Sequence, residues 1–124
     1  MRDRDITVLM KMVQYASEIN ETIVRFDLDF EKFTNDFVVK NAISMCILQI
    51  GELANNLTGE FKSVYIDMPW RDIVNMRHRA VHTYDNMDIK IIWKTATDRI
   101  PELKEYCEKI IKEKEEGFSC QKNL

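Results

Sequence analysis

The sequence is poor in the residues that make tight turns, with only 3 glycines and 2 prolines among 124 residues. An all-β domain needs such residues between its many short strands. The composition therefore argues against sandwiches and barrels and favours helices.

Cysteine is also scarce and shows no pattern. The 3 cysteines, Cys46, Cys107 and Cys120, lack the Cys-x-x-Cys spacing of zinc sites. An odd number of cysteines does not form a complete disulfide framework. We therefore expect a protein of the reducing cytoplasm, and the sequence indicates no metal centre and no cofactor.

Long apolar runs and an excess of positive charge are missing as well. No run approaches the roughly 18 residues of a membrane span, and "MRDRDITVLMKM" lacks the apolar core of a signal peptide. We expect no membrane association. A net charge of −3 does not attract polyanions in general. A phosphate-binding site must therefore be local, and the segment 71–84 carries Arg71, Arg77 and Arg79 against Asp72 alone.

Apolar residues recur at helical spacing in four long segments, at about 3–26, 36–57, 69–83 and 89–116. Short connections between them predict an all-α, antiparallel bundle of four to five helices. We expect one domain over residues 1–116 and a flexible C-terminal tail at 117–124, with Gly117 ending the last helix.

Two residues within these helices need an explanation. The segment 36–57 is apolar around most of its circumference, so it is predicted to be the central helix. Gly51 inside it costs about 1 kcal/mol relative to alanine, and close approach of a neighbouring helix would be one reason to keep it. Pro101 must kink or interrupt the last helix, because it lacks a backbone donor.

Arg77 occupies an unexpected position in the third helix. At about 100° per residue, six apolar residues lie within about 60° of it: Trp70, Ile73, Val74, Ala80, Val81 and Tyr84. The polar residues Asn75, His78 and His82 fall on the opposite side. A permanent charge is thus centred on the face that should meet the core or another molecule.

Several interpretations of this helix remain open. Arg77 can be a core arginine whose head pairs with a carboxylate, for which Glu52 is a candidate. His78 and His82 stand at i,i+4, as two ligands of one metal ion do, but no third ligand is evident. His82 can also simply complement the helix dipole, and Tyr84 can lie at the edge of the core.

A catalytic interpretation combines Arg77 with His82. A guanidinium binds phosphate oxygens, and an imidazole moves protons near neutral pH. Together they can cleave RNA by attack of the 2′-hydroxyl on its own phosphate. In an unbroken helix the two side chains diverge by about 140°. Either the helix unwinds at residues 81–82, or a second copy brings its own His82 close to Arg77.

The stretch "RHRAVHTY" resembles the Arg-x4-His-x-Tyr signature of HEPN-domain proteins, and most closely that of the HepT-like toxins. The flanking segments "RDITVLMKMVQYASEI", "LQIGELANNL", "PWRDIVNMRHRAVHTYDNMD" and "IIWKTATDRIPELKEYCEKII" are similar in order and spacing. The resemblance covers about residues 2–115. It implies a HEPN helical bundle that forms a homodimer with the motif helix at or near the interface.

The resemblance also implies a function. The family contains metal-independent endoribonucleases that cleave tRNA or mRNA, the toxins of type VII toxin–antitoxin systems. Arg77 and His82 take the catalytic positions. Tyr84 takes the position to which an MntA-like minimal nucleotidyltransferase, the antitoxin, transfers AMP. A bulky anionic adduct there would block a phosphate-binding cleft.

Three neighbouring residues are candidate accessories: His78, Arg79 and Asp85. The family usually has Asn or Asp directly after the arginine, where this chain has His78. This imidazole can orient a partner, carry a proton or have no role, and Asp85 can help the antitoxin recognise the site. A different class of function is a non-catalytic nucleotide-binding, substrate-binding or scaffold subunit that partners a nucleotidyltransferase.

Overall fold

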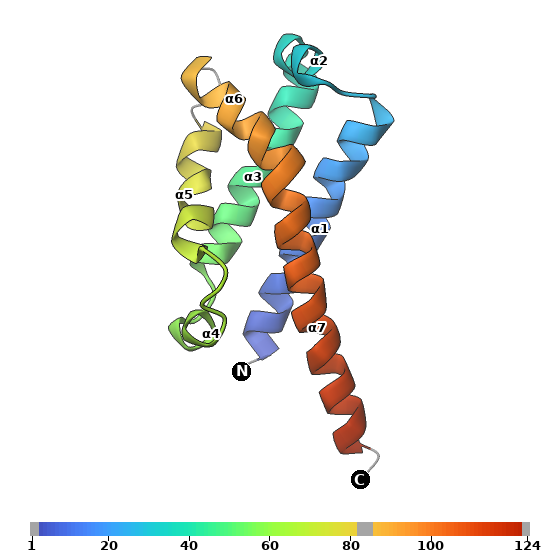
Figure 1. Ribbon diagram of the computed structural model, residues 1–124, viewed down its shortest axis with the longest axis vertical. Coiled ribbons are helices and arrows are strands. Elements are labelled where there is room, and N and C mark those ends of the chain that lie inside the picture. The colour runs from blue at the N-terminus through green and yellow to red at the C-terminus, as the bar shows by residue number, and fades with distance from the viewer. Residues whose placement is uncertain (1–2, 82–85, 123–124) are drawn as a thin grey trace.

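The computed structural model describes residues 3–81 and 86–122, and all regular structure within these ranges is helical. The predicted all-α bundle is therefore confirmed (Figure 1). The helices are, in chain order, α1 (Asp3–Arg25), α2 (Phe30–Asn35), α3 (Phe37–Asn55), α4 (Gly59–Val64), α5 (Trp70–Val81), α6 (Asn86–Lys94), the π-helical turn η1 (Thr95–Arg99) and α7 (Ile100–Lys122).

The long helices alternate in direction. In Figure 1, α1 rises from the N-terminus, α3 returns beside it, α5 rises again, and α6, η1 and α7 descend as one continuous arm. The short helix α2 lies between α1 and α3 at one end of the bundle, and α4 lies between α3 and α5 at the other end. Helix α3 packs against both α1 and α5, and α7 packs against α1.

Helix α3 is the central element, as its sequence predicts. Seven of its residues are buried: Val39, Ile43, Ser44, Ile47, Ile50, Gly51 and Ala54. With 19 residues and a mean hydropathy of 1.4, it is long and apolar enough to cross a membrane. A helix packed on two sides inside a bundle has the same composition.

Short polar contacts fix where the helices begin. The carboxylate of Asp36 accepts a hydrogen bond from the Val38 amide at 3.0 Å and thereby caps α3. Thr58 caps α4, and its amide and hydroxyl both donate to the buried carboxylate of Asp5, at 2.9 and 2.7 Å. These bonds attach the connection before α5 to helix α1.

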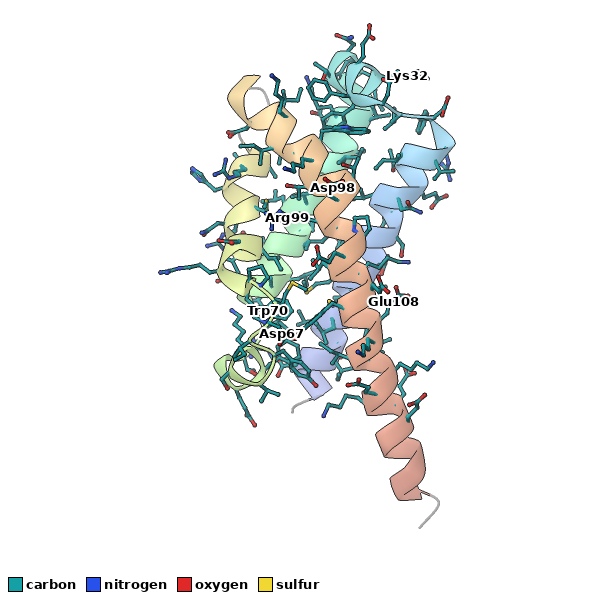
Figure 2. All side chains as sticks on the ribbon, viewed as in Figure 1. Lys32, Asp67, Trp70, Asp98, Arg99 and Glu108 are labelled. Atoms are coloured by element: carbon teal, nitrogen blue, oxygen red, sulfur yellow. The ribbon has the colours of Figure 1, made fainter. Side chains whose placement is uncertain are left out.

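Aromatic packing anchors the start of α5. Trp70 is buried, and its indole Nε1 donates to the carbonyl of Tyr65 at 2.8 Å. Its ring lies 5.5 Å from that of Phe61 and 6.1 Å from that of Tyr106, centroid to centroid. Burial and the nearby Asp67 raise the pKa of Tyr106. Figure 2 shows Asp67 and Trp70 close together beside α4. The first turn of α5 is thereby held against α4 and α7.

The predicted interruption at Pro101 takes the form of the π-turn η1. The Ile100 amide donates to the carbonyl of Thr95, five residues earlier, in place of the usual four. The hydroxyl of Thr97 donates to the carbonyl of Trp93 at 3.0 Å. The wider turn lies directly before the proline, whose ring clashes with the preceding turn of a regular α-helix.

The sequence predicts that the last helix ends at Gly117, and this prediction is wrong. Helix α7 continues through it to Lys122. No glycine that the structure describes has a positive φ, so Gly117 does not take the left-handed conformation of a helix-ending glycine. A glycine inside a helix costs only about 1 kcal/mol, which the neighbouring helical residues can offset.

Cys46 and Cys107 are free thiols. Burial, aided by Glu18, raises the pKa of Cys46 to about 11. Burial, aided by Glu108, raises the pKa of Cys107 to about 12. Both thiols therefore stay protonated at neutral pH, and neither is suited to act as a nucleophile.

Candidate functional site

The two faces of α5 are those that its sequence predicts. Trp70 and Ala80 are buried, and Ile73 and Val74 are half-buried. Arg77 lies on this same side and is itself only half-buried, whereas the polar side chains of the opposite face are exposed. The arginine therefore lies where α5 meets its neighbour α3.

Gly51 of α3 lies directly against Arg77. A Cβ atom added to this glycine would lie 2.9 Å from the Cβ of Arg77 and 3.0 Å from its backbone nitrogen. Such distances are below normal van der Waals contact, so only glycine fits. The predicted reason for Gly51, close approach of a neighbouring helix, is confirmed, and the neighbour is the candidate catalytic arginine.

The guanidinium of Arg77 forms an ion pair with Glu52, at 3.3 Å between Nη1 and Oε1. The predicted partner is confirmed, but the pair is not in the core. The Arg77 side chain is 37% exposed and the Glu52 side chain 50% exposed. A pair this exposed contributes about 0–1 kcal/mol. Another anion can therefore replace Glu52 at little cost.

The surface next to this ion pair is partly apolar. Five residues of α3 project to one side at helical spacing and form what we name the outer α3 stripe: Val38, Ala42, Met45, Gln49 and Glu52. Val38 is 58% exposed and Met45 is 53% exposed. On α5, Val81 stands one turn after Arg77 and is 59% exposed. Arg77 thus lies at the end of an exposed apolar surface.

The candidate accessories His78 and Arg79 lie on the other side of α5. Both are exposed. Arg79 pairs with Asp88 of α6, at 3.6 Å between Nη1 and Oδ1, and this pair connects the end of α5 to α6. The structure therefore does not bring His78 or Arg79 to the guanidinium of Arg77.

Three of the predicted site residues, His82, Tyr84 and Asp85, lie outside the described residues. The described part of α5 ends at Val81, directly before them in the sequence. The approach of His82 to Arg77, within one copy or between two copies, stays a prediction.

A cleft that the sequence does not predict lies between α5 and the α6–η1 arm. It has a volume of about 300 Å³, and three cations line it: Arg79, Lys94 and Arg99. Figure 2 shows Arg99 on the side of the arm that faces α5. In a regular α-helix, residues 94 and 99 would diverge by about 140°, so the sequence alone does not place them together.

Comparison with known proteins gives a consistent result. Residues 12–110 match the model of a family described as "Ribonuclease HepT-like". "Putative RNase MJ0125" of Methanocaldococcus jannaschii is 34% identical over 119 residues, which cover 94% of this chain and 99% of that protein. "Probable ribonuclease HepT" of Thermococcus cleftensis is 34% identical over 97 residues, 78% of this chain and 87% of that protein. No solved structure matches the chain.

Replacing Gly51 with alanine tests the contact that positions Arg77. The new methyl group must push α3 and α5 apart, at a cost of about 1–3 kcal/mol, against a gain of about 1 kcal/mol in helix propensity. We expect Gly51→Ala to lower the free energy of unfolding by about 1 kcal/mol, measured by urea denaturation.

Gly59→Ala is the matched control, since a Cβ at Gly59 would meet nothing within 4 Å. This variant should be as stable as wild type or more stable. A Gly51→Ala protein as stable as the Gly59→Ala protein would contradict the close contact.

Proposed function

Because the chain belongs to the HepT-like ribonuclease family, we propose that it cleaves RNA without a metal ion, at a site that two copies build together from Arg77 and His82. The observation that carries this proposal is the accessibility of Arg77. Its backbone is fixed against Gly51, while its side chain is 37% exposed and its guanidinium is bound only weakly by Glu52. A fixed cation with an exchangeable partner is suited to receive a phosphate.

The proposed reaction is an internal transfer. The 2′-hydroxyl of the substrate attacks the adjacent phosphorus, and a histidine base accepts its proton. As the new bond forms, negative charge grows on the non-bridging oxygens, which Arg77 stabilises by hydrogen bonding and charge. The bond to the 5′-oxygen then breaks, and the imidazolium formed in the first step returns its proton to the leaving oxygen. The products are a 2′,3′-cyclic phosphate and a free 5′-hydroxyl.

A homodimer explains the surface around Arg77. The outer α3 stripe and Val81 expose apolar area that the described part of one chain does not cover. An apolar patch framed by polar residues is typical of an interface. A two-fold axis near Arg77 would bury this patch against the same patch of a second copy. It would also bring the two arginines and the two copies of His82 to one cleft.

The proposed regulation acts two residues beyond His82. We assign Tyr84 as the acceptor of AMP from a cognate MntA-like minimal nucleotidyltransferase, the antitoxin, in the cytoplasm. The support is the match of Arg77, His82 and Tyr84 to the spacing of the family motif. A phosphoester there would place negative charge beside the guanidinium and compete with the phosphate of the substrate.

Substitution of Arg77 and of His82 tests the reaction. In EDTA, the wild-type protein should cleave RNA. Arg77→Ala should lower the rate by about 10²–10³-fold, as loss of a transition-state donor does. His82→Ala should lower it by about 10²–10⁴-fold, as loss of an acid–base group does. Cleavage is measured on labelled RNA in gels, and each variant is checked for wild-type helicity and molecular mass.

Arg71→Ala is the matched control, because Arg71 is an exposed cation of the same helix outside the site. It should leave cleavage within about twofold, since exposed side chains away from a site rarely matter. An Arg77→Ala protein as active as wild type would exclude the assignment. A wild-type protein that binds the nucleotidyltransferase but cleaves no RNA would favour the non-catalytic subunit.

Substitution of Tyr84 tests the regulation. Co-expressed with the nucleotidyltransferase, the wild-type protein should gain the mass of one or more AMP groups and lose ribonuclease activity. Tyr84→Phe should gain no mass and stay active, because it lacks the acceptor hydroxyl. Intact-protein mass spectrometry measures the adduct, with Tyr15→Phe as the control that should still be modified. An AMP adduct that persists on Tyr84→Phe would contradict the assignment.

A further inference from the structure

We propose that the groove between α5 and the α6–η1 arm binds the phosphate backbone of a single RNA strand that leads to the cleavage site. This inference rests on the proposed ribonuclease function and adds a binding surface to it. We name the surface the α5 groove and define it by Arg99, Lys94, Arg79 and His78.

The groove consists of two hollows that join on α5. The first, of about 300 Å³, is lined by Arg79, Lys94 and Arg99 among others. The second lies at the end of α5 and is lined by Asn75, His78, Arg79 and Asp88. Asn75 and Arg79 belong to both hollows, so the groove is continuous. It ends at the last turn of α5, the turn that precedes His82 in the sequence.

The charge of the groove differs from that of the whole protein. Its three permanent cations face two carboxylates, of which Asp88 is already paired with Arg79 and Asp72 remains. Within the described residues, Lys94 and Arg99 form no ion pair, and both are exposed. In a chain of net charge −3, this is a local site for anions. Exposed, unpaired cations along a groove are suited to the spaced charges of a polyanion.

The π-turn brings these cations together. A π-helical turn takes more residues than an α-helical turn, because its hydrogen bond runs from residue i to residue i+5. The wider turn reduces the angle between Lys94 and Arg99 below that of a regular α-helix, and both side chains line the hollow against α5. Between them lies Thr95, whose hydroxyl is 3.5 Å from the sulfur of Met76 on α5. The irregular turn thus creates the cationic wall of the groove.

The floor of the groove favours a nucleic-acid strand over a small inorganic anion. Met76 and Ile91 contribute apolar surface between the cations. An adjacent apolar hollow shares Asp72, Met76, Thr95 and Arg99 with the groove, and Ile47 and Ile73 also line it. A chain whose phosphates meet the cations would have apolar surface beside it for sugar and base.

The test is a double variant, Lys94→Gln with Arg99→Gln, which removes two charges and keeps the side-chain length. The probe is a labelled 12-nucleotide RNA with 2′-O-methyl groups, which cannot be cleaved because its attacking hydroxyl is blocked. Binding is measured by fluorescence anisotropy across a range of salt concentrations. Each phosphate contact to a single strand contributes about 0.7 to the slope of log K against log salt.

Loss of two contacts should make that slope shallower by about 1.4 and weaken binding about tenfold near 0.15 M salt. In cleavage assays the double variant should raise KM by a similar factor and leave kcat unchanged. Both residues are exposed, so folding should be unaffected. The matched control is Lys112→Gln with Lys114→Gln, exposed on α7 about 20 Å along the helix from Arg99; it should change neither slope nor KM.

Other outcomes would contradict the proposed role of the groove. A double variant that binds with the wild-type slope, or a control that weakens binding equally, would exclude these residues as RNA contacts. ATP that binds more tightly than the 12-mer, and loses binding in the double variant, would identify a mononucleotide site instead. If wild type cleaves RNA while the groove variant keeps its KM, the groove fails and the ribonuclease stands. If wild type binds the probe but cleaves nothing, the ribonuclease fails.

Discussion

The contact between Gly51 and Arg77 is the constraint on which the rest of the site depends. It brings α3 and α5 so close that a methyl group would not fit, and it fixes the backbone of the arginine against the central helix. The guanidinium then emerges at the surface, beside Glu52 and the outer α3 stripe. The helix is held firmly while the charged end stays accessible. This division would let a residue on an apolar face serve both packing and the proposed chemistry.

Much of the fold could be predicted because it is encoded locally. The all-round apolarity of α3 predicts a central helix. Gly51 predicts a close neighbour, and Glu52 is a candidate partner for Arg77 that the structure confirms. In each case a single helix, or one residue, carries the signal.

The features that the sequence does not predict depend on irregular backbone or on small free-energy differences, such as the cost of a glycine within a helix. Gly117 resembles a helix end, but α7 continues past it, since the cost of a glycine within a helix is small. Lys94 and Arg99 line one groove across η1, whose wider turn differs from the regular α-helix that the sequence predicts there. A proline predicts that the regular helix is interrupted before it, but not that the interruption is a π-turn. The exposure of the Arg77–Glu52 pair also depends on how the helices pack, which the spacing of residues in the sequence does not reveal.

The central claim is that Arg77 of one copy works with His82 of the other. The most direct test mixes the Arg77→Ala and His82→Ala proteins, each inactive alone, and allows their subunits to exchange. If the site is shared across the two-fold axis, about half of the dimers are mixed, and each has one intact site of two. The account therefore predicts recovery of about a quarter of wild-type ribonuclease activity. A mixture that forms mixed dimers, as shown by native mass spectrometry, yet stays as inactive as its components would contradict the shared site.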